Sequence, residues 1–271
     1  RMTQQSEHDA MVEETWRRFL IKGYIANERR QQRLFKILPA QRRCKFCKAP
    51  LAGTGASVAR VFFDKRPSNL NPRFCNVCEE FALEHQGGAE INIAMLFADV
   101  RGSTTLAEKL SASEFSRLIN RFYRSATGVL IQSDALIDKL IGDEVVGIYV
   151  PGFAGPDYVH RSVEAAQELL RLTGHGDETG PWIPVGAGIH TGQAFVGAVG
   201  AKDGVIDITA LGDVPNTASR LASQAAGGEI ILSESTARAA RIDTSNLERR
   251  QLELKGKSEP MTVWVMKSTG E

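Results

Sequence analysis

The pattern that most limits the possible folds is an alternation of strand-like and helix-like segments that begins near residue 90. The segment Ile91–Ala98 is a short apolar run of the kind that forms a buried central strand. The segment Ser113–Ile131 follows, with apolar residues spaced for one face of a helix. Gly142-Asp143 then separates two further strand-like segments, as a tight hairpin does. This order favours an α/β (α+β) fold with a ferredoxin-like β-α-β-β-α-β core.

The alternation continues to the end of the chain. We expect strands over residues 136–141, 145–150, 206–211, 229–233, 247–254 and 261–267, and helices over residues 158–173, 214–225 and 234–240. Thr191-Gly192 predicts a second hairpin, which would join strands over residues 183–190 and 194–199. The predicted fold is therefore a ferredoxin-like core with extra C-terminal strands.

The charged residues divide the chain into two halves of opposite sign, although the formal net charge of the whole is only +1. Residues 1–88 carry 16 lysines and arginines against 9 acidic residues, whereas residues 89–271 carry 17 against 23. Halves of opposite charge indicate two domains with different roles. We therefore predict a small helical, cysteine-containing domain over residues 1–88, a larger domain over residues 89–271, and a linker at Gly87-Gly88.

The small domain opens with a segment that predicts a basic amphipathic helix. Apolar residues recur at three- and four-residue steps over residues 11–38, and Pro39 ends the pattern. Such a helix packs on its own domain or on a second copy of the chain, or it contacts nucleic acid. Because a mixed face of this kind is more often solvated, the sequence does not favour a nucleic-acid partner.

All four cysteines of the chain lie in the small domain, as two Cys-x-x-Cys pairs. Cys44 and Cys47 form the first pair, Cys75 and Cys78 form the second, and 27 residues separate the pairs. Two such pairs place four thiolates on two turns, which suits a tetrahedral zinc ion. An iron–sulfur cluster also takes four thiolates, and a redox disulfide is a third alternative. We favour zinc, with basic neighbours such as Lys45 offsetting the negative charge, and expect the next helix to begin after Cys78.

Two absences bear on the location of the protein. The sequence contains no run of about 18 uncharged apolar residues, so we expect no membrane-spanning helix. The first residues contain no apolar segment of the type that a secretory signal requires. We therefore expect a cytoplasmic protein whose cysteines remain reduced.

Two aspartates of the larger domain occupy positions where strands end. Asp99 follows the strand Ile91–Ala98, and Asp143 lies at the tip of the first hairpin. In a ferredoxin-like sheet these positions can lie side by side, where two carboxylates repel each other unless metal ions lie between them. On geometry alone, both aspartates are equally well interpreted as ordinary turn residues. The residues after Asp99 open a helix whose N–H groups suit phosphate, and they are Val100, Arg101, Gly102, Ser103 and Thr104.

Four sequence blocks identify the larger domain more specifically. They are MLFADVRGSTTLAE, KLIGDEVVGIYVP, GIHTGQAFVGAVG and TALGDVPNTASRLAS, and they occur in this order. Together they resemble the catalytic domain of the class III nucleotide cyclases over about residues 90–267. The resemblance implies that Asp99 and Asp143 hold two Mg²⁺ or Mn²⁺ ions in each active site. It also implies that Asn216 and Arg220 are catalytic.

The same resemblance assigns the residues that read the purine. Lys139 and Thr209 match the base-reading positions of the Thr-bearing adenylyl cyclases, whereas guanylyl cyclases of the family carry Glu and Cys there. A lysine donates to N1 of adenine and a threonine accepts from its amino group, whereas guanine mismatches both. ATP is thus the expected substrate. Lys255, in the segment LKGK, matches a lysine that contacts the terminal phosphates in relatives, and Pro215 departs from the valine often found there.

The resemblance also implies a homodimer. In relatives the two metal-binding aspartates come from one chain, and the base-reading, asparagine and arginine residues come from its partner. We therefore expect an enzyme that converts ATP to 3′,5′-cyclic AMP and pyrophosphate, regulated by the metal-binding domain over residues 1–88. The alternatives are a guanylyl or mixed-specificity cyclase, and a catalytically silent nucleic-acid-binding regulator.

Overall fold

The computed structural model describes residues 4–23, 26–68, 71, 73–200, 206–254 and 259–267, with the backbone alone for residues 4, 5, 26–29 and 139–141. Its contacts divide the chain into two compact units. Unit 1 contains Arg1–Ile91, Val150–Gly155 and Gln193–Leu211, and unit 2 contains Asn92–Tyr149, Pro156–Gly192 and Gly212–Glu271. Within the described ranges, no helix combines the length and the apolar character needed to cross a bilayer.

Unit 2 alternates helices and strands in the order that the sequence predicts. It holds α5 (Ser103–Lys109), α6 (Ala112–Gln132), β4 (Leu136–Ile141), β5 (Glu144–Tyr149), α8 (Tyr158–Leu172), α9 (Asp213–Gln224), β8 (Glu229–Ser233), α10 (Glu234–Ala239), β9 (Glu248–Leu252) and β10 (Met261–Lys267). Two long strands, β3 (Gly87–Val100) and β6 (Val185–Gly200), belong partly to unit 2 and partly to unit 1.

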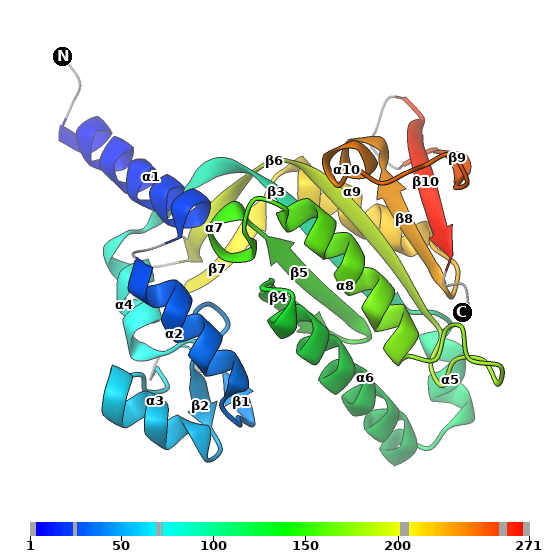
Figure 1. Ribbon diagram of the computed structural model, residues 1–271, viewed down its shortest axis with the longest axis horizontal. Helices are drawn as coiled ribbons and strands as arrows, with labels where there is room; N and C mark the ends of the chain where they lie inside the picture. The colour runs from blue at the N-terminus through cyan, green and yellow to red at the C-terminus, as the bar shows by residue number, and fades with distance from the viewer. Residues whose placement is uncertain are drawn as a thin grey trace. The chain divides into compact units, whose positions relative to one another are not determined.

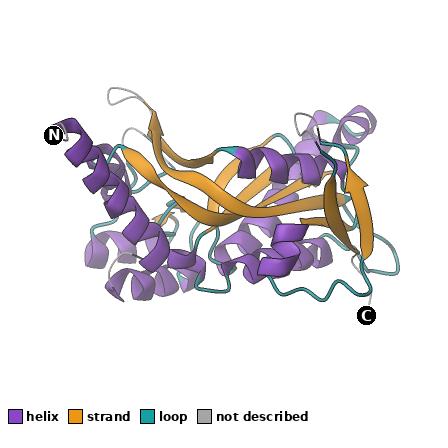
Figure 2. Ribbon diagram, turned by 90° about the horizontal axis from the view of Figure 1, so that it is seen from above, coloured by secondary structure: helices purple, strands orange, loops and turns teal. Residues whose placement is uncertain are grey.

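In the described part of the chain, eight strands form one large sheet. Its order is β4-β5-β3-β6-β8-β10-β9, and β7 (Ile206–Leu211) pairs with β6. The first four strands of this sheet along the chain, β3 to β6, thus lie in the order β4-β5-β3-β6, which is the order of a ferredoxin-like β-α-β-β-α-β core. The predicted ferredoxin-like fold with extra C-terminal strands is therefore confirmed. Figure 2 shows the twist of the long strands.

Two amphipathic helices cover the strands β4 and β5. α6 begins at a capping box, in which the hydroxyl of Ser111 accepts from the N–H of Glu114 and the Glu114 carboxylate accepts from the N–H of Ser111. The buried side of α6, which includes Phe122 and Leu130, faces these strands. α8 lies beside α6 and contacts β5 (Figure 1).

The helix α9 lies very close to β6. A Cβ atom on Gly188 of β6 would stand 2.1 Å from the backbone nitrogen of Ala222 and 2.7 Å from the carbonyl oxygen of Ala218, both on α9. Glycine is therefore required at this position. On its buried face α9 packs Leu221 against Val263 of β10, within a core shared with β8. The position of α9 matters because it carries Asn216 and Arg220.

Unit 1 contains helices around an aromatic core. Its elements are α1 (Gln4–Lys22), α2 (Ala26–Ile37), β1 (Arg42–Arg43), β2 (Pro50–Ala52), α3 (Gly55–Phe63), α4 (Asn76–Glu84), α7 (Pro151–Ala154) and β7, with the start of β3 and the end of β6. Trp16 of α1 is fully buried, and its indole N–H donates to the carbonyl of His85 at 2.8 Å. Its ring also meets Phe81 of α4 edge-on, with 5.1 Å between the ring centroids. These contacts hold α1 against α4.

The single helix predicted over residues 11–38 was wrong, because two helices occupy this segment. α1 ends at Lys22 and α2 begins at Ala26. Gly23 follows α1 with a φ of 72°, a left-handed conformation that glycine adopts without strain. Its N–H donates to the carbonyl of Phe19 at 3.1 Å and so completes the last turn.

Two further predictions were wrong because strands continue where the sequence suggested a break. Gly87-Gly88, predicted as a linker, begins β3, and a Cβ on Gly88 would lie 2.4 Å from the carbonyl oxygen of Val196 in β6. The glycine is there to allow close approach of the two strands. The hairpin at Thr191-Gly192 is absent, because β6 continues through it and the buried Thr191 hydroxyl donates to the carbonyl of Ile93 at 2.6 Å.

Candidate active site and metal centre

The structure brings the two predicted metal-binding aspartates together. Asp99 ends β3, and Asp143 lies in the turn between β4 and β5, where Gly142 takes a φ of 62°. The strands β3 and β5 pair with Asp99 opposite Glu144, and the N–H of Val100 donates to the carbonyl of Asp143 at 3.2 Å. Both aspartates are half-buried. Local pairing therefore places the two carboxyl groups at one end of the sheet.

The electrostatics of Asp99 reflect this crowding. Burial raises the pKa of its carboxyl above the ordinary value, Arg101 opposes the rise, and Asp143 adds to it. The guanidinium of Arg101 contacts the Asp99 carboxylate directly and donates to the carbonyl of Ser223 at 3.2 Å. Two neighbouring carboxylates are a donor set that suits Mg²⁺ or Mn²⁺, because hard cations prefer oxygen ligands and offset the repulsion between them.

The predicted phosphate-binding segment after Asp99 is only partly available. The N–H of Val100 is bonded to Asp143, and the N–H of Arg101 donates to the carbonyl of Pro184 at 2.8 Å. These two backbone groups are therefore engaged within the protein, and the phosphate-binding role of Val100 and Arg101 stays a prediction that their backbone N–H groups do not support. The candidates that remain are Gly102, Ser103 and Thr104, at the beginning of α5.

A tyrosine that sequence reasoning missed supports the aspartate turn. The hydroxyl of Tyr123, on α6, donates to the carbonyl of Gly142 at 2.7 Å. Burial raises the pKa of this phenol, and the charge of Asp143 raises it further. A tyrosine on an amphipathic helix gives no sign in the sequence that it reaches a hairpin tip almost twenty residues later.

Three further predicted site residues lie on α9 and β7. Asn216 is exposed on α9, where its side-chain amide donates to the carbonyl of Gly212 at 3.1 Å, and Arg220 follows one turn later, half-buried. Residues four apart share one helix face. Thr209 is half-buried on β7, opposite Gly197 of β6.

Two of the predicted substrate-binding residues are described in part or not at all. Lys139 lies on β4, opposite Val146 of β5, and its side chain is outside the described part of the structure. Lys255 falls outside the described residues altogether.

The four cysteines form one cluster in unit 1. Their sulfur atoms all lie within 4.8 Å of one another, and the sulfurs of Cys47 and Cys75 are 3.7 Å apart. Around a single zinc ion with Zn–S bonds of about 2.3 Å, a regular tetrahedron of sulfurs has edges of about 3.8 Å. Cys47 is half-buried and the other three are buried. The cluster therefore has the composition and the size of a four-thiolate metal site.

Two short backbone motifs build the cluster. Cys44 and Cys47 lie on a turn between β1 and β2, in which Lys48 adopts a φ of 65° and its N–H donates to the carbonyl of Cys44 at 3.1 Å. Cys75 is the N-cap of α4, and Cys78 lies in its first turn. The helix thus begins before Cys78, whereas the sequence predicted that it begins after this residue.

The thiols share protons unequally. Burial opposes ionisation of Cys44, but hydrogen bonds from the other three thiols outweigh burial and lower the pKa of Cys44 well below its usual range. The same hydrogen bonds, together with burial, raise the pKa of Cys47 and of Cys78. A cation bound by the four sulfurs would favour their ionised forms.

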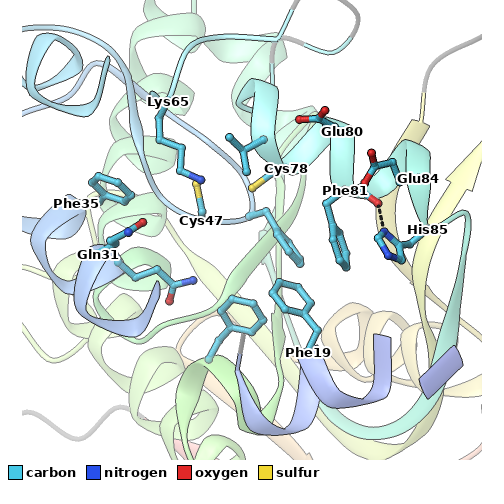
Figure 3. Close-up of a pocket in the computed structure, with 14 residues that line it drawn as sticks. Phe19, Gln31, Phe35, Cys47, Lys65, Cys78, Glu80, Phe81, Glu84 and His85 are labelled. Atoms are coloured by element: carbon cyan, nitrogen blue, oxygen red, sulfur yellow. Dashed lines mark hydrogen bonds between the residues drawn. The ribbon is translucent and has the colours of Figure 1, made fainter. Parts of the chain in front are cut away.

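A cavity of about 290 Å³ adjoins the cluster. The rings of Phe19 and Phe81 and the thiol-bearing residues Cys47 and Cys78 line it (Figure 3). Lys65, a basic residue that sequence reasoning did not single out, is buried, and Figure 3 shows its amino group beside Cys47. Burial lowers the pKa of Lys65, but the four thiols outweigh burial and raise it. One side of the cluster is therefore reached through an aromatic-walled space.

The partners of Lys45 lie far from it in the sequence. Its amino group binds the carboxylate of Asp207 at 2.8 Å and the carbonyl of Ile208 at 2.7 Å, both on β7. The direct partners of Lys45 are thus on β7, whereas Figure 3 shows Lys65 beside Cys47.

Comparison with known proteins identifies the family of the larger domain. Residues 87–267 match the sequence model of a family described as the adenylate and guanylate cyclase catalytic domain. An adenylate cyclase of Anabaena cylindrica is 29% identical over 186 residues, which make up 65% of this chain and 37% of that protein. The chain spans 37% or less of the length of the first curated relatives that it matches.

Solved structures with the same fold include enzymes for both nucleotides. The guanylyl cyclase Cya2 is 27% identical, with a TM-score of 0.60 over 69% of this chain and 96% of that one. The adenylyl cyclase CyaB from P. aeruginosa is also 27% identical, with a TM-score of 0.57 over 66% of this chain and 95% of that one. With the family match covering most of its length, this chain belongs to the class III nucleotide cyclases, the family of adenylate and guanylate cyclase catalytic domains.

Proposed function

We propose that this chain is an adenylyl cyclase, which converts ATP to 3′,5′-cyclic AMP and pyrophosphate at two equivalent sites of a homodimer. The observation that carries the proposal is that Asp99 at the end of β3 and Asp143 in the turn before β5 lie at the same end of the sheet, since Asp99 is opposite Glu144 and the N–H of Val100 donates to the carbonyl of Asp143. The reaction requires the ribose 3′-oxygen to attack the α-phosphorus while the bond to the pyrophosphate oxygen breaks. Divalent ions, when bound, lower the pKa of the 3′-hydroxyl and neutralise the phosphates.

The residues of the chain supply binding and orientation. Asp99 and Asp143 hold the two Mg²⁺ or Mn²⁺ ions of one site. The partner subunit offers its own copy of the α9 face, on which the arginine braces negative charge at the α-phosphate and the asparagine orients the ribose. Their spacing of one helical turn on α9 supports joint action, because it places both on one face.

ATP is the proposed substrate because of the two base-reading positions. Lys139 and Thr209 suit the N1 acceptor and the amino group of adenine, and a buried polar mismatch rejects guanine. The adenylate cyclase of Anabaena cylindrica among the relatives supports this choice. The structural similarity to the guanylyl cyclase Cya2 makes GTP the second candidate.

Nucleotide preference is tested by measuring kcat/KM for ATP and GTP with Mg²⁺ and with Mn²⁺. We expect ATP to be preferred. The double variant Lys139→Glu, Thr209→Cys carries the residues of guanylyl cyclases and should shift the preference towards GTP. Equal or greater activity with GTP in the unmodified chain would refute the proposed substrate.

The shared sites are tested by mixing inactive variants. Asp99→Ala and Arg220→Ala chains should each be inactive alone, and together they should regain activity, because each mixed dimer contains one intact site. The matched control mixes Asp99→Ala with Asp143→Ala, whose changes fall in the same half-site, and should stay inactive. Absence of rescue in dimers shown by mass to be mixed would refute sites shared between subunits.

We propose further that the four cysteines bind one zinc ion and that residues 1–88 regulate a catalytic domain over residues 89–271. The compactness of the cluster supports zinc, because the thiolates of an iron–sulfur cluster bind different iron atoms and stand farther apart. Mass spectrometry of the metal content should find one zinc ion per chain. Iron with inorganic sulfide and visible absorption would refute the assignment.

A further inference from the structure

The strand β7 is held on its outer side by the segment that contains the cysteines. β7 pairs with β6 along one edge, with Ile208 opposite Ala198. In an antiparallel ladder, alternate residues direct their carbonyl groups away from the partner strand. The carbonyl of Ile206 accepts from the side-chain amide of Asn71 at 3.0 Å, and that of Ile208 accepts from the amino group of Lys45 at 2.7 Å. Two side chains of the cysteine segment thus bind two successive outward carbonyls of one strand.

An ion pair strengthens this attachment. The side chain of Lys45 is 4% exposed, and its amino group lies 2.8 Å from the carboxylate of Asp207. The same carboxylate accepts from the N–H of Ile208 at 2.9 Å, which fixes its direction along the strand. Arg73 also reaches Asp207, but at 3.4 Å and with a side chain 43% exposed. Because a buried ammonium without its carboxylate is strongly unfavourable, Lys45 and Asp207 move together.

The position of Lys45 is set by the metal-binding turn. It lies between Cys44 and Cys47, its N–H donates to the carbonyl of Arg73 at 2.8 Å, and its carbonyl accepts from the amino group of Lys48 at 3.3 Å. A metal ion bound by the flanking sulfurs would fix the conformation of this turn. The direction in which Lys45 leaves the turn would then depend on whether the cluster holds its metal.

Thr209 lies two residues beyond Asp207 on the same strand. Side chains two apart in a strand share a face, and they are about 6.6 Å apart along it. Asp207 and Thr209 are both half-buried, whereas Ile206, Ile208 and Ala210 are buried, as this alternation requires. A displacement of β7 at Asp207 consequently displaces Thr209.

We propose that Lys45 is a positioning residue: through Asp207 and the Ile208 carbonyl it couples the metal-bound cysteine cluster to the placement of Thr209. This inference rests on the proposed base-reading role of Thr209 and deepens it. The zinc site then acts on the preference between ATP and GTP, rather than only stabilising the fold of the first 88 residues.

The test compares Lys45→Met with Lys45→Arg and Arg73→Gln in the full chain. Methionine keeps the length of the side chain and removes the charge, whereas arginine can still pair with Asp207. Lys45→Met should keep one zinc ion per chain and lower the ATP-to-GTP ratio of kcat/KM by about tenfold, mainly through KM for ATP. Lys45→Arg should restore most of the ratio, and Arg73→Gln should change it less than about twofold. Asp207→Asn keeps the shape of the side chain and removes its charge, and it should lower the ATP-to-GTP ratio of kcat/KM as Lys45→Met does. This variant replaces Lys45→Met in the test if Lys45→Met does not fold.

A second measurement does not depend on activity. Hydrogen exchange of the backbone amides over residues 206–211 should be faster in Lys45→Met, and faster in the unmodified chain after a chelator has removed its zinc. Unchanged exchange in both cases would overturn the inference. The inference would also be overturned if Thr209→Ala changes the ATP-to-GTP ratio of kcat/KM while Lys45→Met and Asp207→Asn both leave this ratio unchanged.

Failure of the proposed function has a different signature. If Thr209→Ala leaves the nucleotide ratio unchanged, Thr209 does not read the base and the proposed specificity is refuted. The attachment of β7 to the cluster is then judged by hydrogen exchange alone, where faster exchange in Lys45→Met supports it and unchanged exchange refutes it.

Discussion

Replacing Gly188 by alanine tests whether the close packing of α9 on β6 sets the position of the helix that carries Asn216 and Arg220. The new Cβ atom would stand 2.1 Å from the backbone nitrogen of Ala222 and 2.7 Å from the carbonyl oxygen of Ala218. Ordinary contact begins at 3.4 Å, so α9 would have to move by about 1.3 Å, because backbone atoms cannot rotate away as a flexible side chain does. Overpacking of this kind lowers the free energy of unfolding by about 3 kcal/mol.

The effect on catalysis should be larger than the effect on stability suggests. Asn216 and Arg220 are carried by α9, and a misplacement of about 1 Å lowers the rate by about 100-fold. We therefore expect kcat with ATP and Mg²⁺ to fall by about 100-fold at a temperature where circular dichroism shows the variant folded.

A second glycine provides the control. A Cβ on Gly128, within α6, meets no atom within 4 Å, so Gly128→Ala should leave kcat unchanged and raise stability by up to about 1 kcal/mol. If Gly188→Ala matched the unmodified chain within twofold in kcat and within about 0.5 kcal/mol in urea unfolding, the contact would not position α9.

Three further predictions address other parts of the molecule. Burial lowers the pKa of His175, whose Nε2 accepts from the N–H of Val185 at 2.9 Å, so the unfolded chain takes up a proton before the folded chain does as pH falls. The free energy of unfolding should therefore fall by up to about 1.4 kcal/mol per pH unit as pH drops from 7 towards 5. His175→Gln should reduce this pH dependence, as measured by urea titrations. Cys47→Ser removes one of the four sulfurs and should weaken zinc binding by more than about 100-fold, which is the upper range for mutating a residue that only supports a metal ligand. Competition with a chromogenic chelator measures the affinity, and an unchanged affinity would exclude Cys47 as a ligand. Trp16→Phe should lower the free energy of unfolding by about 2 kcal/mol, because the carbonyl of His85 loses its donor inside the core; an equal midpoint and slope in urea would contradict this.

The parts of the fold that the sequence predicted are those set by local residue patterns or by the order of strands and helices along the chain. α6, with its capping box at Ser111, follows from local spacing and capping. The approach of Asp99 and Asp143 likewise follows from a hairpin that places its tip beside the end of the neighbouring strand. The helix is decided within its own segment, whereas the approach of the two aspartates, which α5 and α6 separate along the chain, was predicted from the strand order of a ferredoxin-like sheet.

The errors arose where tertiary contacts override a local signal. Thr191-Gly192 has the composition of a turn, yet the hydroxyl of Thr191 bonds to the carbonyl of Ile93 and keeps the strand extended. Gly88 was predicted to lie in a linker, but the lack of a side chain at this position allows β6 to approach β3 closely. The partner of Lys45 is 162 residues away, and no spacing rule connects a lysine in a cysteine turn with an aspartate on a distant strand.

The opposite charges of the two halves of the sequence also have an explanation in the structure. Lys45, Lys48 and Lys65 are each at most 7% exposed, so these three positive charges are not part of a surface that faces a polyanion. Lys45 neutralises Asp207, an acidic residue from the negatively charged half, and Lys65 lies beside the thiols. A zinc ion with four thiolates carries a net charge of about −2, which buried ammonium groups offset at short range. Part of the basic character of residues 1–88 is therefore matched to charges inside unit 1, and this weakens the electrostatic argument for a nucleic-acid-binding module.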